Sequence, residues 1–119
     1  MFSLTTEYAL RAMAELAAAP ATQQAIAESV GIPPSYISIV LRRLTQAGLV
    51  TVQRGVGGGT SLARPAKRIS LLENIEAIEP LARKAPSTKG PMNREVNAAV
   101  AELRKRLAST SLADVAKVH

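Results

Sequence analysis

The sequence contains no cysteine, and its one histidine is the last residue, His119. The lack of cysteine excludes disulfides, thiol catalysis, zinc sites built on cysteine and iron–sulfur clusters held by thiolates. With one histidine we also expect no metal site of several histidines and no Ser-His-Asp triad. No other nucleophile and base, and no two carboxylates, have a spacing that indicates catalysis. We therefore do not expect an enzyme.

Long hydrophobic runs are also missing. No apolar run approaches the roughly 18 residues that cross a bilayer, and the first residues include Glu7, Arg11 and Glu15, unlike the core of a signal peptide. We expect a cytoplasmic protein that does not contact a membrane. The 119 residues suffice for one domain, and 47% hydrophobic with 20% charged residues is a globular balance.

The first 48 residues have the pattern of three helices. Residues 4–19 contain no Gly or Pro and are rich in strong helix formers. A short second helix follows, with Thr22 as its cap and Gly31 as its left-handed stop. The third helix runs through SYISIVLRRLTQ and stops at Gly48. Two helices joined by a tight turn with glycine form a helix-turn-helix pattern.

The pattern changes after Gly48. LVTVQR alternates, GVGGG is typical of a turn and TSLAR returns, so residues 49–64 are predicted to form a β-hairpin. Ser70 and Glu73 have the spacing of a capping box for a short helix. A helix-turn-helix followed by a hairpin is a winged helix, whose third helix enters a DNA major groove while the hairpin, or wing, flanks it. The predicted fold is mainly α with a small β-hairpin.

The remainder is predicted to be a loop and a long helix. We divide the chain into a winged-helix domain over 1–80, a loop over 81–91, and a dimerisation helix with a capped C-terminal turn over 92–119. An apolar stripe runs along the long helix through Val96, Val100, Leu103 and Leu107. The stripe packs either on its own domain or on a second copy. We expect a homodimer, because a small domain rarely needs a long terminal helix except to meet a partner.

Acidic residues are absent from the middle of the chain. The net charge is +6, and the stretch from 29 to 72 holds six basic residues and no acidic one: Arg42, Arg43, Arg54, Arg64, Lys67 and Arg68. Such a block can be a solvated surface. Because it coincides with the third helix and the hairpin, we favour phosphate binding.

The third helix has one apolar and one polar face. The apolar face is predicted to be core and holds Ile37, Val40, Leu41 and Leu44. The opposite face holds Ser35, Ser38, Ile39, Arg42 and Gln46, with Tyr36 and Arg43 at its margins. Hydroxyls and an arginine suit base edges and phosphates. Ile39 is either an isolated surface hydrophobe or a contact for a thymine methyl, and both interpretations stay open.

A glycine run follows the first predicted strand. It lacks the Lys-Ser/Thr that ends a P-loop, and it leads into an extended segment rather than the helix of a dinucleotide site. We expect a wing tip formed by Gly57, Gly58 and Gly59, flanked by Arg54 and Arg64 and able to approach DNA closely.

Three segments, LTTEYALRAM, GIPPSYISIVLRRLTQAGLV and RGVGGGTSLARP, resemble the Rrf family of bacterial winged-helix regulators. That family includes the iron–sulfur-assembly regulator and the nitric-oxide-sensing repressor, and the resemblance covers residues 3–79 closely. It implies a homodimeric transcription factor on a palindromic operator. We expect a repressor, although the sequence does not distinguish a repressor from an activator. Ser35 and Tyr36 match the pair that opens the family's recognition helix, Arg54 matches the wing arginine, and Thr5 matches the start of the first helix near the DNA backbone.

The chain departs from the family pattern in two places. Ser38 and Ile39 stand where some members carry Glu-Gln, so the operator sequence cannot be transferred. Cluster-binding members have three cysteines where this chain has PLARKAPSTKGPMN, so we expect no cofactor. Two alternatives remain: a winged helix that contacts proteins, and a regulator that binds an unidentified small effector between the long helix and the DNA-binding domain.

Overall fold

The computed structural model describes residues 2–79 and 91–116. It confirms a mainly helical fold with a two-stranded hairpin. The elements, in chain order, are α1 (Leu4–Ala18), α2 (Gln23–Val30), α3 (Pro34–Gln46), β1 (Val50–Gln53), β2 (Gly59–Leu62), the 3-10 turn η1 (Ala66–Arg68), α4 (Leu71–Ile78), α5 (Pro91–Ser109) and α6 (Leu112–Ala116).

The core lies where α1 meets α2, α3, α4 and α6. The predicted local signals are present: Thr22 accepts a hydrogen bond from the Ala25 N–H at 3.1 Å and caps α2, and Gly31 ends that helix at φ 84°. Pro34 begins α3, where a missing N–H costs nothing. The four predicted core positions of α3 are all buried, namely Ile37, Val40, Leu41 and Leu44. The apolar face of α3 therefore fixes which face remains outside.

The hairpin is antiparallel, with a register from Val50 opposite Leu62 to Gln53 opposite Gly59. A third short segment supports it. The Thr60 N–H donates to the Ala21 carbonyl oxygen at 2.8 Å, and the Ala21 N–H donates back to Thr60 at 3.0 Å. The connection between α1 and α2 thus anchors β2 of the wing beside the helix-turn-helix.

The capping box of α4 is also confirmed. The Glu73 N–H donates to Ser70 Oγ at 3.0 Å, and the Ser70 N–H donates to Glu73 Oε1 at 3.1 Å. In the capped last turn, α6, the Leu112 N–H donates to the Ile69 carbonyl at 2.7 Å. This bond holds the start of α6 beside the residues that precede α4.

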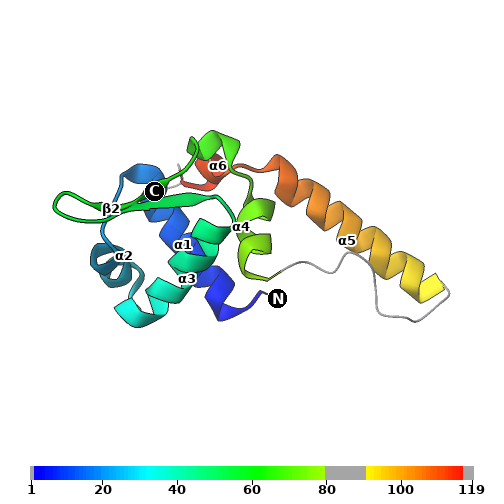
Figure 1. The fold of residues 1–119 in the computed structure, drawn as a ribbon. Coiled ribbons are helices and arrows are strands. Elements are labelled where there is room, and N and C mark those ends of the chain that lie inside the picture. The colour runs from blue at the N-terminus through cyan, green and yellow to red at the C-terminus, as the bar shows by residue number, and fades with distance from the viewer. Residues whose placement is uncertain (1, 80–90, 117–119) are drawn as a thin grey trace.

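The long helix α5 projects from one end of the molecule, and the hairpin projects from the other (Figure 1). The principal extents are 58 × 27 × 23 Å. Arg104 joins α5 to α4 by two bonds to the carboxylate of Glu76, at 3.0 and 3.1 Å. The predicted loop over 81–91 lies outside the described residues except for Pro91, which begins α5. Within the described ranges, no helix is long and apolar enough to span a membrane.

Candidate nucleic-acid interface

The start of α3 is positioned by α1 and α2. Gln23 Nε2 donates to the Pro34 carbonyl at 3.0 Å, which ties α2 to the first turn of α3. The hydroxyls of Thr5 and Tyr36 are hydrogen-bonded to each other, and the ring of Tyr36 meets that of Tyr8 edge-on at 5.6 Å and 86°. The family resemblance assigned Thr5 and Tyr36 to DNA as separate residues. In the structure their hydroxyls form one hydrogen-bonded pair.

The outer face of α3 carries the residues expected to read DNA. Ser35, Ile39 and Arg42 are exposed, and Ser38 is partly buried. Ile39 has an exposed fraction of 45%, which leaves its side chain available to a partner. The geometry agrees with the predicted recognition face, and the contact with DNA stays a prediction.

A groove of about 670 Å³ separates α3 from the hairpin. Ser38, Arg42 and Gln46 line it from α3, and Gln53 and Arg54 line it from the hairpin. Gln23 lines its end. The sequence analysis missed Gln23 and Gln53; the signal for Gln53 was its place beside Arg54 at the end of an alternating strand. These side chains place two guanidinium groups along a groove that Leu41 and Val52 also line.

Two of the predicted DNA-binding arginines are engaged within the protein. Arg43 Nη1 donates to the Ile78 carbonyl at 3.2 Å, so this side chain reaches α4. Arg64 donates to the Arg68 carbonyl at 2.9 Å and forms an ion pair with Glu73 at 2.5 Å. The prediction that Arg64 flanks the glycine tip is wrong, because the residue lies beyond the last residue of β2, at the base of the wing.

The ion pair with Arg64 also affects Glu73. Partial burial raises the pKa of Glu73, but hydrogen bonds from Arg64 and Ser70 outweigh burial and lower it on balance. An arginine held by an ionised carboxylate carries less net charge toward an external phosphate. Of the two arginines that flank the hairpin, Arg54 is therefore the one that lines the groove, whereas Arg64 is paired with Glu73.

The wing tip is compact because of its glycines. The Gly58 N–H donates to the Gly55 carbonyl at 2.9 Å, and Gly57 adopts φ 78°. A Cβ on Gly58 would lie 2.2 Å from the Gln53 carbonyl oxygen. Gly59 pairs with Gln53 in the hairpin register. A tip this narrow is able to approach another backbone closely, as the glycine pattern predicted.

The apolar stripe of α5 is only partly covered by its own domain. Val96 has an exposed fraction of 43%, whereas Val100, Leu103 and Leu107 are partly buried. Met92, one turn earlier, is 76% exposed. The end of α5 near Arg104 packs on α4, and its first half extends away from the other elements (Figure 1). Dimerisation through this stripe stays a prediction.

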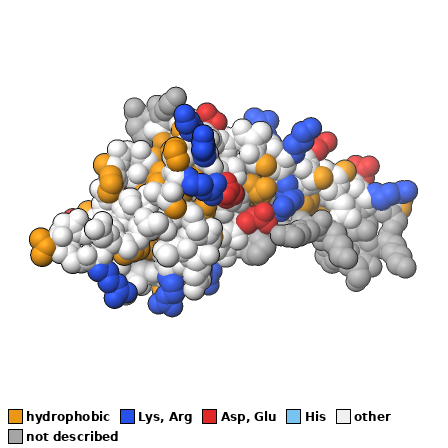
Figure 2. Space-filling model, turned by 45° about the horizontal axis from the view of Figure 1, so that its top comes forward, with side chains coloured by type: hydrophobic (Ala, Val, Ile, Leu, Met, Phe, Trp, Pro, Cys, Tyr) orange, Lys and Arg blue, Asp and Glu red, His pale blue; other side chains and the backbone are white. Residues whose placement is uncertain are grey.

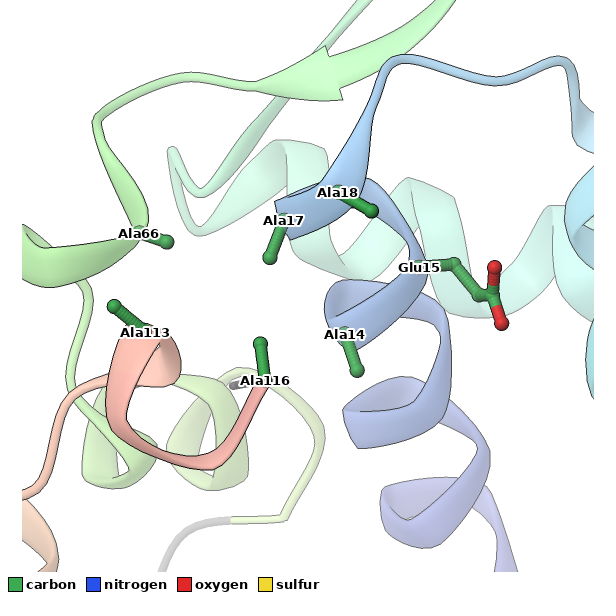
Figure 3. Close-up of a pocket in the computed structure, with 7 residues that line it drawn as sticks. All are labelled: Ala14, Glu15, Ala17, Ala18, Ala66, Ala113 and Ala116. Carbon is green, nitrogen blue, oxygen red and sulfur yellow. The ribbon is translucent and has the colours of Figure 1, made fainter. Parts of the chain in front are cut away.

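A pocket of about 500 Å³ lies between α1, η1 and α6. Its lining includes Ala17, Ala66, Ala113 and Ala116, whose methyl groups face one another, whereas Glu15 points away from them (Figure 3). This place differs from the expected effector cleft beside the long helix. The lining offers no polar group directed inward that would select a ligand.

Comparison with known proteins identifies the family. Residues 2–118 match the Rrf2 family, described as an iron-dependent transcriptional regulator. The chain belongs to the Rrf2 family. It is therefore a DNA-binding transcriptional regulator rather than an enzyme.

Relatives agree in sequence and in structure. A candidate HTH-type transcriptional regulator of Mycobacterium tuberculosis is 35% identical, over 96% of this chain and 80% of that protein. A similarly named protein of Synechocystis sp. is 40% identical, over 64% of this chain and 56% of that protein. The structure of CymR, the global cysteine regulator of B. subtilis, has a TM-score of 0.87 at 27% identity, over 100% of this chain and 98% of that one. The structure of IscR of T. potens has a TM-score of 0.81 at 29% identity, over 98% of this chain and 86% of that one.

The family description names iron, and the donor groups of this chain do not fit it. The whole chain has no cysteine and one histidine. Across residues 2–79 and 91–116, no three His, Asp or Glu side chains come together as a metal site. An iron–sulfur cluster needs thiolate or imidazole ligands in number. The residues that would hold such a group are missing, so no role for iron follows from this chain.

Proposed function

We propose that this Rrf2 regulator is a cytoplasmic repressor that binds a palindromic operator as a homodimer. The observation that carries the proposal is the groove between α3 and the hairpin, which presents Arg42 and Arg54 beside the exposed face of α3. Phosphates attract such guanidinium groups, and bases present acceptors to them in the major groove. The operator contact is the function that this geometry supports best.

The side chains divide into two roles. Ser35, Ser38, Ile39 and Arg42 share the outer face of α3 and read bases in the major groove. The paired hydroxyls of Thr5 and Tyr36 bind a phosphate beside the start of α3, because each still has donor or acceptor capacity. Arg54 follows the backbone or the minor groove from the wing. Arg43 and Arg64 have no direct DNA contact in this proposal, because both are engaged with other elements.

The second copy binds through α5. Val96 of its stripe and Met92 one turn earlier are exposed, and burial of these apolar side chains against a partner would stabilise the helix. A two-fold axis beside the apolar stripe of α5 presents two α3 helices to one face of DNA. Recognition helices of such dimers enter major grooves about one helical turn, roughly 34 Å, or a multiple apart. The palindrome follows from the two-fold symmetry.

The test begins with selection of bound sites from random or genomic DNA. Binding to the selected site and to unrelated DNA is then measured across a salt series for Ser38→Ala, Ile39→Ala and Arg54→Ala. We expect a lost base contact to cost about 1–3 kcal/mol and to relax the preference at one position. Arg54→Ala should weaken binding to all DNA sequences alike. It should also reduce the slope of log affinity against log salt concentration by about one.

Arg106→Ala is the matched control for charge. This exposed arginine lies near the end of α5. That end of the helix is next to α6 and away from α3 (Figure 1), so loss of the arginine should leave specificity and salt slope nearly unchanged. Unchanged specificity in both α3 variants, with the fold intact, contradicts the recognition face. Absence of salt-dependent DNA binding by the unaltered protein contradicts the proposed function as a whole and favours a winged helix that contacts proteins.

A further inference from the structure

The tip of the wing carries an apolar side chain that the described residues leave uncovered. Val56 has an exposed fraction of 110%, the highest of the large hydrophobic side chains in the described part of the chain. In Figure 2 a hydrophobic side chain stands alone at the far end of the hairpin. Full exposure leaves the whole side chain available to a partner.

The backbone holds Val56 in this position. The Gly58 N–H donates to the Gly55 carbonyl at 2.9 Å, which closes a four-residue turn with Val56 second and Gly57 third. A positive φ at the third position, here 78°, is typical of a type II turn. The close approach of Gly58 to Gln53 keeps this turn narrow. Val56 is therefore presented by a defined turn, although no neighbouring side chain packs on it.

The charge around the tip selects the class of partner. Residues 50–64 contain no acidic residue, and Arg54 lies two positions before Val56. The minor groove of DNA is about 6 Å wide, with phosphates at its rims and sugar carbons on its walls. Narrow A·T-rich minor grooves attract arginine, and apolar side chains insert there in several DNA-binding proteins. A slender tip with one cation and one apolar side chain matches that groove.

We propose that Val56 enters the DNA minor groove at the wing and contacts the groove floor and sugars of an A·T step. The inference rests on the proposed function, since it requires the operator complex. Arg54 supplies attraction to the phosphates, and Val56 supplies an apolar contact that disfavours the exocyclic amino group of guanine. Val56 is thus a determinant of sequence preference outside the bases that α3 reads.

Two substitutions separate this contact from electrostatics. Val56→Ala removes the apolar bulk, and Val56→Thr keeps the branched shape but adds a hydroxyl. On the selected operator we expect Val56→Ala to bind roughly tenfold more weakly, the change that corresponds to two lost methyl groups. The salt slope should stay unchanged because no phosphate contact is lost. Val56→Thr should fall between the unaltered protein and Val56→Ala.

Val115→Ala is the matched control, since Val115 is a valine with an exposed fraction of 38% on α6, which packs on α1 and η1. It should bind as the unaltered protein does. Thermal unfolding confirms that each variant folds. Because the Val56 side chain is fully exposed, neither change at this position should lower the unfolding temperature.

A modified operator locates the contact. Replacing adenine by 2,6-diaminopurine at the wing step adds an amino group to the minor groove and leaves the major-groove edge unchanged. The unaltered protein should lose affinity for this operator, and Val56→Ala should lose much less. Equal losses for both proteins, or full affinity of Val56→Ala for the natural operator, overturn the proposal while the proposed function stands. A reduced salt slope in Val56→Ala also overturns it, because the change then acts through a phosphate contact.

Discussion

Single side chains place α1 beside α3, the proposed recognition helix. Glu79, the residue after α4, accepts hydrogen bonds at Oε1 from the Ser3 N–H and from Thr6 Oγ1, both at 2.6 Å. Thr6 is fully buried, so its hydroxyl needs a partner within the protein. A carboxylate at the N-terminus of α1 also suits the helix dipole. The preceding residue, Thr5, is hydrogen-bonded through its hydroxyl to Tyr36 of α3. The end of α4 thereby orients the start of α1 next to the recognition helix.

This contact predicts a pH dependence of stability. Hydrogen bonds from Thr6 and then from Ser3 lower the pKa of Glu79 below its ordinary value. The carboxylate is thus favoured in the folded state, and its contribution is complete above the ordinary glutamate pKa of about 4.3 and lost as the pH falls through the lowered value. We expect Glu79→Gln to unfold at lower urea concentration at pH 7, and its difference from the unaltered protein to shrink below pH 4.

The control for this measurement is Glu15→Gln. It removes the same charge from an exposed position near the other end of α1. Its urea midpoint should stay close to that of the unaltered protein at pH 7. A constant difference between Glu79→Gln and the unaltered protein from pH 7 to pH 3 would contradict the assigned cause.

At the scale of elements, the recognition helix and the wing depend on different forces. Burial of Ile37, Val40, Leu41 and Leu44 holds α3 against the core, so its outer face tolerates substitution. The wing is held by the ladder between β1 and β2 and by the bond between Thr60 and Ala21. Its outer end has no core, and backbone geometry alone determines its shape. Changes of backbone should therefore affect the wing first.

The glycines of the tip test this difference. In Gly58→Ala the new Cβ would meet the Gln53 carbonyl at 2.2 Å, so the turn must open. In Gly57→Ala the new methyl meets nothing within 4 Å, and the strain comes only from φ 78°, about 1–2 kcal/mol. We expect Gly58→Ala to speed amide exchange in β1 and β2 more than Gly57→Ala does, and to weaken operator binding more.

The unfolding temperature of Gly57→Ala should fall by only several degrees, because about 1–2 kcal/mol of strain is its whole cost and the tip contributes no buried side chain. Amide exchange followed by NMR measures the hairpin, and calorimetry measures the core. Amide exchange in Gly58→Ala that is slower than or equal to that in Gly57→Ala would contradict this prediction. It would show that the turn accommodates the new Cβ without loosening the hairpin.

At the scale of the whole molecule, the elongated shape separates the two proposed contact surfaces. The wing lies at one end and the first half of α5 at the other (Figure 1). The paired Arg104 and Glu76 attach α5 to α4, with side-chain exposures of 27% and 22%. A partner bound along α5 therefore leaves the wing and α3 accessible. This separation allows one chain to contact a second copy and DNA together.

A charged substitution in the apolar stripe of α5 tests the proposed dimer contact. Val96→Glu places a carboxylate in the apolar stripe, where burial against a partner would desolvate it. Light scattering at micromolar concentration should report about twice 12.5 kDa for the unaltered protein and a mass near 12.5 kDa for Val96→Glu. Val115→Glu is the control and should remain a dimer, since Val115 lies on α6. A monomeric unaltered protein that binds a palindrome tightly contradicts the proposed dimer contact.

The composition of the whole chain predicts independence from iron. Protein purified without oxygen should contain no stoichiometric iron and should lack the visible absorption of thiolate-bound clusters. Its affinity for the operator should be the same with and without nitric oxide or a chelator. Metal analysis and a DNA titration measure both. A cluster in stoichiometric amount would require ligands other than cysteine.

The sequence by itself determined the elements and much of the outer face of α3. Periodicity, Thr22, Gly31 and the Ser70 capping box act over a few residues, so their consequences can be derived without tertiary contacts. The same holds for the positions of α3 that face the core, because a helix with one apolar stripe has one way to bury it. The absence of cysteine likewise needs no structure to exclude thiolate ligands.

Tertiary structure decided which cations remain available and how the wing ends. Arg43, Arg54 and Arg64 look equivalent in the sequence, yet Arg43 reaches the Ile78 carbonyl and Arg64 reaches Glu73. These partners belong to other elements, and a local pattern contains no information about which elements meet. The full exposure of Val56 likewise depends on the direction of a turn. Long-range packing sets these features because charge pairing and exposure are properties of neighbours in space, which the order of residues does not specify.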